Sequence, residues 1–302
     1  MISVRLATRG SPLALAQTAL AFEALRRTWP DLDARVVEVR TEGDENRRAA
    51  LYEIGGRGVF VRAIEQALLD GRADAAVHSL KDMPTAPADG LVIAAVLERG
   101  DPRDALVAPA GRRLADLPPG ARVGTGSRRR ALLLRALRPD LVIEGIRGNV
   151  ETRMKSVASG GYDAVVLAAA GLQRLGRLGE ATQLFEAIEF LPAPGQGAIA
   201  LQCRADDEPT RRLLSTADHA ITHAAVDAER GFLAALGTGC ELPVGAFGQL
   251  EDGLLTVRAM LGGATDAEPP RFGDATGSAE EAYELGRSLG ERLLAMTAEG
   301  AA

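Results

Sequence analysis

The chain has 302 residues, of which 46% are hydrophobic and 25% are charged, and its formal net charge is −6. These values are typical of a soluble globular protein of two or three domains, and the acidic balance gives no reason to expect nucleic acid as a partner. No apolar run approaches the length of a membrane span, and residues 1–10 lack the pattern of a secretion signal. The two cysteines, Cys203 and Cys240, imply no disulfide framework, so we expect a cytoplasmic protein.

The first two thirds of the chain show two successive runs of alternating strands and helices. In the first run we expect strands at 4–8, 35–39, 73–77 and 91–97, with helices at 13–25 and 59–69. After a polar break at 98–104, we expect strands at 122–125, 141–144 and 164–167, with helices at 129–137 and 150–158. This alternation predicts an α/β fold with parallel sheets, arranged as two lobes with a cleft between them.

The last third follows a different pattern. Prolines and glycines in 190–197 indicate a second crossing between the lobes, and 198–203 is predicted to be a strand that returns to the first lobe. A long helix at 218–236, strands at 244–250 and 254–261, and a final helix at 280–296 predict a small α+β domain. We therefore expect a first lobe of 1–97 plus 198–216, a second lobe of 103–191, and a third domain of 217–302.

Four basic loops follow predicted strands. In parallel α/β sheets, ligands bind beyond the carboxyl ends of the strands, so we expect these loops to gather around one site. The loops are Arg9-Gly10-Ser11, His78-Ser79-Leu80-Lys81-Asp82, the run 124–130, and Arg147-Gly148-Asn149 with Arg153 in the next helix.

The loop at 124–130 carries three arginines in the first turn of a helix for which Ser127 is the expected N-cap. Because a helix N-terminus disfavours cations, this arrangement predicts a bound anion, although solvated arginines on a surface helix are the alternative. The loop lacks the glycine spacing of a dinucleotide site and the ending of a P-loop. Arginines spread over several loops are better suited to a ligand with several carboxylates.

Three further residues carry possible chemistry. Asp82 either pairs with its neighbour Lys81 or stabilises a developing cation and carries protons, and the sequence leaves both open. Cys203 lies in a strand-like run and is interpreted as core packing. Cys240 follows Gly237-Thr238-Gly239, which leaves space near the sulfur, but spacing alone does not separate an inert cysteine from a covalent one.

The histidines do not predict a metal site. His219 and His223 are one turn apart on a predicted helix, but no third ligand stands at a familiar spacing. We interpret both as helix-face residues, and His78 as a hydrogen-bonding residue of its loop.

Taken together, nine stretches resemble the porphobilinogen deaminase (hydroxymethylbilane synthase) family. Each stretch alone is weak, but they run in the family's order over nearly the whole chain, which makes the ordered set specific. They are residues 7–15, 55–60, 77–84, 99–105, 123–130, 147–153, 169–176, 192–198 and 239–245.

The resemblance implies a transferase of tetrapyrrole and heme biosynthesis. Such an enzyme joins four porphobilinogen molecules head to tail, with loss of ammonia, onto a dipyrromethane cofactor, and hydrolysis releases hydroxymethylbilane. The cofactor would be held through a thioether to Cys240. The implied fold has two lobes like periplasmic binding proteins plus a small α+β domain. The implied partner is the small-molecule substrate alone, without nucleic acid or membrane, and the protein would be a monomer.

The resemblance also assigns roles to individual residues. Asp82 would face the pyrrole nitrogens as the catalytic group. The expected cofactor-binding residues are Cys240, Lys81, Asp82, Thr125, Ser127, Arg129, Arg130, Arg147 and Gly148. The expected substrate-binding residues are Arg9, Ser11, Gln17, Arg147, Arg153 and Arg174. Departures from the family pattern are Glu53, where lysine is common, Gly126 and Arg128 in the third loop, and Thr238 near the cysteine.

Two other functions remain compatible with the sequence. A two-lobed solute-binding protein for a ligand with several carboxylates would use the same fold and arginines, but it would need neither Asp82 nor Cys240. A cofactor-free relative that acts as a binding module is the second. Only the enzyme should carry a dipyrromethane adduct that is lost in Cys240→Ser.

Overall fold

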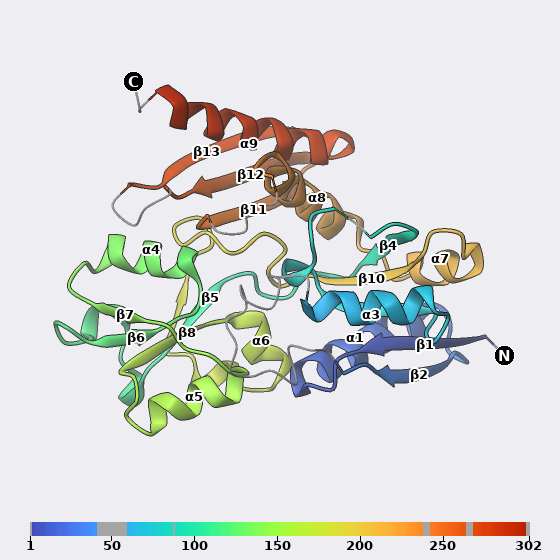
Figure 1. Ribbon diagram of the computed structural model, residues 1–302, viewed down its shortest axis with the longest axis horizontal. Helices are drawn as coiled ribbons and strands as arrows, with labels where there is room; N and C mark the ends of the chain where they lie inside the picture. The colour runs from blue at the N-terminus through green and yellow to red at the C-terminus, as the bar shows by residue number, and fades with distance from the viewer. Residues whose placement is uncertain (1, 41–58, 87, 238–241, 264–267, 300–302) are drawn as a thin grey trace. The chain divides into compact units, whose positions relative to one another are not determined.

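The structure is a computed structural model that describes residues 2–40, 59–86, 88–237, 242–263 and 268–299 (Figure 1). The chain divides into two compact units, Met1–Gly100 with Ala198–Ala224, and Asp101–Gly197 with Ala225–Ala302. In the described ranges, no helix is both long and apolar enough to cross a membrane.

The first unit is built on a five-stranded sheet of order β2-β1-β3-β10-β4. β1 pairs in parallel with β2 and β3, whereas β10 runs antiparallel to both β3 and β4. The elements are β1 (Ser3–Thr8), α1 (Pro12–Thr28), β2 (Asp33–Glu38), α3 (Val59–Leu69), β3 (Ala75–Ser79), a 3-10 turn (Leu80–Asp82), β4 (Leu91–Val96), β10 (Ile199–Arg204) and α7 (Glu208–Ser215).

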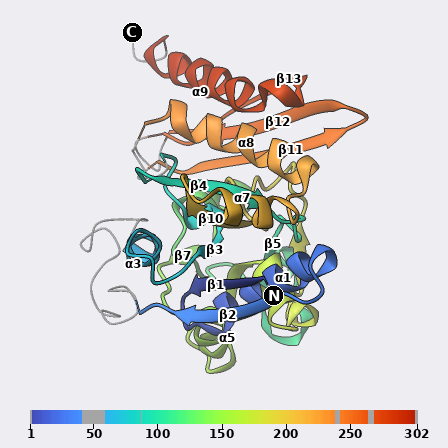
Figure 2. The same ribbon diagram turned by 90° about the vertical axis from the view of Figure 1, so that its right-hand side faces the viewer.

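Helices cover both faces of this sheet, because alternate strand residues point to opposite sides. Leu25 of α1 packs with Leu6 and Val77 on one face. On the other face, Leu68 of α3 packs with Ala76. Figure 2 shows α1 and α3 on opposite sides of β1 and β3.

The second unit contains a sheet of order β7-β6-β8-β5-β9, which repeats the arrangement of the first sheet. β6 pairs in parallel with β7 and β8, and β5 is antiparallel to β8 and β9. The elements are β5 (Asp104–Val107), β6 (Arg122–Gly124), α4 (Arg128–Leu137), β7 (Val142–Glu144), α5 (Val150–Ala158), β8 (Ala164–Ala168), α6 (Ala169–Arg174) and β9 (Gln183–Phe185), with short 3-10 turns at Pro109–Gly111, Leu114–Asp116 and Leu178–Glu180.

Both sheets are therefore mixed, and the expectation of parallel sheets is wrong for one strand in each. The antiparallel strands β5 and β10 are the first strands after the chain passes from one unit to the other. Neither follows a strand–helix–strand crossover within its own sheet, so the connection does not require a parallel direction. The α/β class and the return of residues 198–203 to the first sheet are confirmed.

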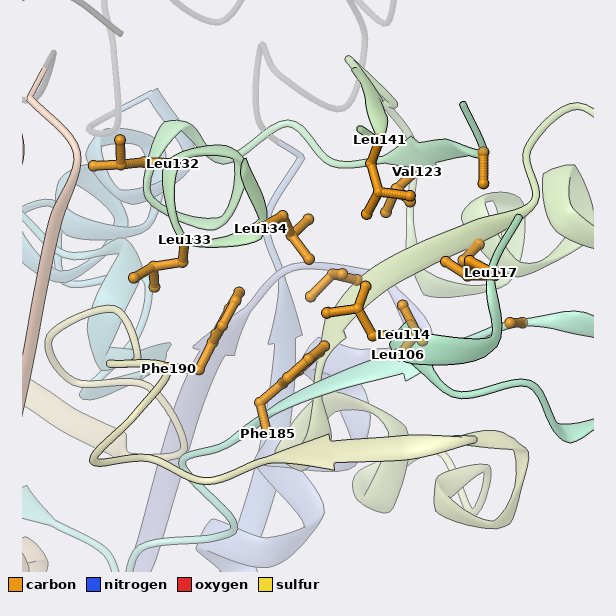
Figure 3. Close-up of a cluster of buried hydrophobic side chains, with 14 of the residues drawn as sticks. Leu106, Leu114, Leu117, Val123, Leu132, Leu133, Leu134, Leu141, Phe185 and Phe190 are labelled. Carbon is orange, nitrogen blue, oxygen red and sulfur yellow. The ribbon is translucent and has the colours of Figure 1, made fainter. Parts of the chain in front are cut away.

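One buried hydrophobic cluster of the second unit lies between α4 and its sheet. Figure 3 shows Leu133 and Leu134 of α4 above Phe185 and Phe190. The two aromatic rings stack with centroids 4.5 Å apart. Met260 joins this buried cluster from the C-terminal part of the unit.

That C-terminal part is an antiparallel sheet of order β11-β12-β13 with two helices. Its elements are α8 (Ala220–Ala235), which begins within the first unit, β11 (Val244–Glu251), β12 (Leu254–Leu261), β13 (Arg271–Ser278), a 3-10 turn (Ala279–Glu281) and α9 (Ala282–Glu299). The two helices approach at glycines, since a Cβ on Gly286 would lie 1.8 Å from the Ala228 carbonyl oxygen and one on Gly231 would lie 2.0 Å from that of Tyr283.

Candidate active site

In the first unit, two of the predicted loops follow neighbouring parallel strands. Arg9 and Ser11 come after β1, while Lys81 and Asp82 form the 3-10 turn after β3. Ser11 is the N-cap of α1, as predicted, and its Oγ accepts a hydrogen bond of 3.3 Å from the Ala14 amide. The parallel pairing places both loops at the same edge of the sheet.

The turn that carries Asp82 is held by backbone hydrogen bonds. The Leu80 amide donates to the Ala198 carbonyl at 3.1 Å, and the Met83 amide donates to the Leu80 carbonyl at 3.1 Å. Asp82 is exposed and Lys81 is partly buried. Asp82 thus lies where a ligand at this sheet edge could reach it.

Gln17 lies in α1 and is buried. Its Nε2 has no hydrogen-bond partner among the residues that the structure describes. A buried amide without an acceptor costs free energy, so this position suits a polar ligand group such as a carboxylate.

In the second unit, Thr125 and Ser127 connect β6 to α4. The Ser127 amide donates to Thr125 Oγ1 at 3.1 Å, and the Arg130 amide donates to Ser127 Oγ at 3.4 Å, which confirms Ser127 as the N-cap. Each hydroxyl oxygen accepts from the backbone, so its own hydrogen remains to be donated. A cavity of about 270 Å³ is lined by both residues, by Arg128 and Arg135 of α4, and by Glu144.

The departure at Gly126 has a steric reason. A Cβ at this position would lie 3.2 Å from the Ile146 carbonyl oxygen, so a side chain would have to displace the neighbouring loop by a few tenths of an ångström. Arg128, the other departure in this loop, is exposed.

Arg129 and Arg130 turn into the protein rather than into solvent, with only 4% and 6% of their surface exposed. Both meet Asp104, which is fully buried at the start of β5. Arg129 Nη1 donates to Asp104 Oδ2 at 2.8 Å, and Arg130 Nη2 donates to Oδ1 at 2.6 Å. Two of the three arginines of this helix turn are therefore buried ion-pair partners, which excludes the solvated surface alternative for them.

Burial alone would raise the pKa of Asp104, but the two guanidinium groups outweigh it and hold the pKa well below its ordinary value. One carboxylate faces two guanidinium groups, so the three side chains keep a net positive charge that favours an anion.

Gln196 completes this buried group. Its Nε2 donates to Asp104 Oδ1 at 2.9 Å and to the Pro102 carbonyl at 2.7 Å, while its Oε1 accepts from Arg130 Nη2 at 3.5 Å. Neither Asp104 nor Gln196 was among the sequence-predicted site residues. The sequence shows only a single acid before the apolar run 105–108, and the need of its carboxylate for a partner becomes evident once the strand is seen to be buried.

Arg147 and Gly148 follow β7, with Gly148 at a φ of 102° that disfavours other residues. A Cβ there would also lie 2.8 Å from Thr152 Cβ. The Gly148 carbonyl accepts a hydrogen bond of 2.8 Å from Arg153 Nε, so the glycine shapes the loop that orients Arg153. Arg147 itself is exposed.

Arg153 and Arg174 are partly buried cations. Burial, and secondarily the nearby Arg130, lowers the pKa of Arg153. Burial lowers the pKa of Arg174 to about 10, and its Nη2 donates to the Gly197 carbonyl at 2.5 Å. In the described part of the chain, neither guanidinium forms an ion pair with an acid. A bound carboxylate would offset the cost of burying these charges.

The three groups of the second unit share one edge of the sheet. β7, β6 and β8 are adjacent and parallel, and they are followed respectively by Arg147 to Arg153, by Thr125 to Arg130, and by the helix that carries Arg174. The structure thus brings the predicted site residues between 125 and 174 to one edge of this sheet.

Of the two cysteines, the structure describes Cys203 but not Cys240. Cys203 is fully buried in β10 and belongs to a hydrophobic cluster of the first unit, which confirms the prediction of core packing. Burial raises the pKa of its thiol to about 11. Cys240, Thr238, Glu53 and residues 55–58 lie outside the described residues.

Comparisons with known proteins identify one family. Residues 4–212 match the family model described as porphobilinogen deaminase, dipyromethane cofactor binding domain, and residues 223–295 match the model for the porphobilinogen deaminase C-terminal domain. A porphobilinogen deaminase of Leifsonia xyli subsp. xyli is 49% identical, covering 99% of this chain and 93% of its own length. One of Syntrophobacter fumaroxidans is 44% identical, covering 96% of this chain and 94% of its own length.

Among solved structures, the chain resembles the methionine binding protein MetQ, with a TM-score of 0.45 and 12% identity over 71% of this chain and 89% of that one. The two family models together span most of the sequence, including every described residue of the arginine-rich sheet edge. The chain belongs to the porphobilinogen deaminase family.

Proposed function

We propose that this chain is a hydroxymethylbilane synthase that joins four porphobilinogen molecules head to tail with loss of ammonia. The observation that carries the proposal is the set of cations beyond β7, β6 and β8, in which Arg153 and Arg174 have no acidic partner among the described residues. Each porphobilinogen bears an acetate and a propionate side chain. Paired carboxylates on every ring require this kind of distributed guanidinium recognition.

The residues also fit the dipyrromethane cofactor named by the family model. We assign Thr125, Ser127, Arg129, Arg130, Arg147 and Gly148 to its carboxylates, together with Lys81, and we assign Cys240 to its thioether. The supporting observations are the hydroxyl hydrogens left free at Thr125 and Ser127 and the net positive charge around Asp104. When bound, the cofactor supplies a nucleophilic pyrrole α-carbon.

The remaining residues act on the substrate. Arg9, Ser11, Gln17, Arg153 and Arg174 bind and orient its carboxylates, which holds the reacting carbon in place. Departure of ammonia from the protonated aminomethyl group leaves an electrophilic azafulvene that carries its proton on the pyrrole nitrogen and therefore bears positive charge. The exposed carboxylate of Asp82 stabilises that charge and receives the proton that is released when the new carbon–carbon bond forms.

The test of this function is conversion of porphobilinogen to hydroxymethylbilane by the purified chain. Asp82→Ala should retain the wild-type melting temperature, because the side chain is exposed, and should lose activity by about 10²- to 10⁴-fold. The matched control is Asp89→Ala, an exposed aspartate in the same connection, which should keep full activity. A wild-type chain that binds porphobilinogen without releasing ammonia would favour the solute-binding alternative instead.

We further propose that the protein works as a monomer in the cytoplasm. The scarcity of cysteine supports a reducing compartment. Light scattering on the eluted protein should give the mass of one chain.

A further inference from the structure

A buried chain of hydrogen bonds runs through the first unit, through residues to which no role has been assigned above. His78 Nε2 lies 3.0 Å from Gln202 Oε1, and Gln202 Nε2 donates to Glu65 Oε1 at 3.0 Å. The exposed fractions of the three residues are 4%, 0% and 8%. The chain links β3, β10 and α3, and we call it the relay.

The sheet register explains why these side chains meet. His78 pairs with Ala200, and Gln202 pairs with Ala76, so the two polar side chains are diagonal neighbours on one face. The same face is covered by α3, whose Ile64 and Leu68 are apolar. In such surroundings a broken hydrogen bond leaves a buried polar group unsatisfied, so the relay strongly favours one arrangement of these elements.

The relay also has a fixed direction. Because Gln202 donates its amide hydrogen to Glu65, its oxygen accepts from His78, which places the imidazole hydrogen on Nε2. Burial lowers the pKa of His78 to about 4, so the ring is neutral at physiological pH. The three groups form one continuous donor–acceptor series from β3 to α3.

The position of the relay relative to Asp82 suggests its role. His78 lies one residue before the end of β3, and the turn that carries Lys81 and Asp82 begins at Leu80. That turn is anchored to the residue immediately before β10 by the hydrogen bond from the Leu80 amide to the Ala198 carbonyl. The relay thus links β3 and β10 to α3 by hydrogen bonds, immediately before the turn in the sequence.

We propose that Glu65, Gln202 and His78 are positioning residues that hold the Lys81–Asp82 turn in the geometry needed for turnover, an inference that rests on the proposed function. A displacement of about 1 Å in a catalytic group can cost roughly a hundredfold in rate. The relay should therefore affect kcat much more than the KM for porphobilinogen, because it acts on the turn that carries Asp82 rather than on the arginines that bind the substrate.

The experiment compares Glu65→Leu with Glu65→Gln, whose amide oxygen can still accept from Gln202. Glu65 is the least buried member, so its variants test the relay with the least disturbance to folding; Gln202→Leu is the second disruption. The matched control is Cys203→Ala, which removes a buried side chain from the opposite face of the same strand. Activity is expressed per cofactor-loaded molecule, with loading measured by intact mass.

We expect Glu65→Leu and Gln202→Leu to lower kcat about ten- to a hundredfold with KM within twofold, and Glu65→Gln to restore at least half of the wild-type kcat. Cys203→Ala should lower the melting temperature but leave kcat unchanged. Amide hydrogen exchange should quicken at residues 79–83 in Glu65→Leu and Gln202→Leu, but not in Cys203→Ala.

The proposal is overturned if folded Glu65→Leu and Gln202→Leu keep kcat within twofold of wild type, or if Cys203→Ala loses kcat to the same extent. A wild-type chain that forms no product contradicts the proposed function instead. In that case the exchange rates at 79–83 still decide whether the relay holds the turn.

Discussion

Asp104 and Arg174 represent two ways in which this protein handles buried charge. Asp104 is enclosed by Arg129 and Arg130, so the buried carboxylate has two cationic partners. Arg174 carries its charge with only a carbonyl oxygen as its described acceptor. The first arrangement contributes to folding as well as to the positive charge that we assign to cofactor binding, whereas the second suits ligand binding without contributing to folding.

Arg130→Met should destabilise the protein by about 3–5 kcal/mol, because it leaves Asp104 with one guanidinium and removes hydrogen bonds to a buried carboxylate. Urea unfolding followed by circular dichroism measures this change. An unfolding free energy within about 1 kcal/mol of wild type would show that the buried ion pairs contribute little.

Arg174→Met should have the opposite profile. Loss of the hydrogen bond to Gly197 and relief of the buried charge should nearly cancel, so that the free energy of unfolding changes by less than about 1 kcal/mol. Loss of a charge-assisted contact to a substrate carboxylate should raise KM roughly 10- to 100-fold. A wild-type KM would remove Arg174 from the substrate site.

His78 should make folding sensitive to mild acid. The pKa of its imidazole falls from 6.5 to about 4 on burial, so below pH 6.5 the unfolded chain binds a proton that the folded chain does not. This uptake of a proton by the unfolded chain lowers the free energy of unfolding. The loss is absent above pH 6.5, grows as the pH falls toward 4, and reaches about 2 kcal/mol at pH 5.

The measurement is urea unfolding at pH 7.5 and pH 5 for the wild type and His78→Gln. Between pH 7.5 and pH 5, the free energy of unfolding of the wild type should fall by about 2 kcal/mol more than that of His78→Gln. If the unfolding free energies of the two proteins differed equally at both pH values, the imidazole of His78 would be protonated as readily in the folded protein as in the unfolded chain.

At the scale of single residues, the sequence predicted those roles that depend only on neighbouring residues along the chain. Ser11 and Ser127 are N-caps, because a serine before a helical run has few other roles. Asp104 could not be found in this way, because its role depends on a strand that begins inside a segment interpreted as a polar break. The position of His78 was also wrong in detail, since it lies in β3 rather than in the following loop.

At the scale of elements, the long periodic segments were predictable, and the short or polar ones were not. The helix at 59–69 and the strand at 254–261 were predicted with the bounds that the structure shows. β9 has three residues, and β13 alternates partly buried with exposed positions without a strong apolar pattern. The direction of β5 and β10 depends on the path of the chain between units, which no local pattern encodes.

The contact between α8 and α9 depends on glycine. Gly286→Ala would place a Cβ 1.8 Å from the Ala228 carbonyl oxygen, so the helices must separate. The expected cost is about 3 kcal/mol or more. Thermal unfolding should show a clear loss for this variant and little change for Gly179→Ala, where no heavy atom lies within 4 Å of the added carbon. Equal melting temperatures would contradict close helix packing.

At the scale of the whole molecule, the same sheet topology occurs in both units. In each five-stranded sheet the loops that carry predicted site residues follow neighbouring parallel strands, and the antiparallel strand is the one that enters from the other unit. The family resemblance is visible in nine ordered stretches of the sequence, because those stretches are largely the loops at these strand ends. The pairing of side chains within them, such as the Asp104 group, depends on the folded arrangement and has no linear pattern.

The central claim is that this chain carries a dipyrromethane bound covalently to Cys240 and that its arginines bind the pyrrole carboxylates. Intact mass spectrometry of the purified full-length protein and of Cys240→Ser tests it most directly. The account predicts that the wild type exceeds its sequence mass by one dipyrromethane and that the variant has the sequence mass alone. A wild-type protein at its unmodified sequence mass that still converts porphobilinogen to product would contradict it.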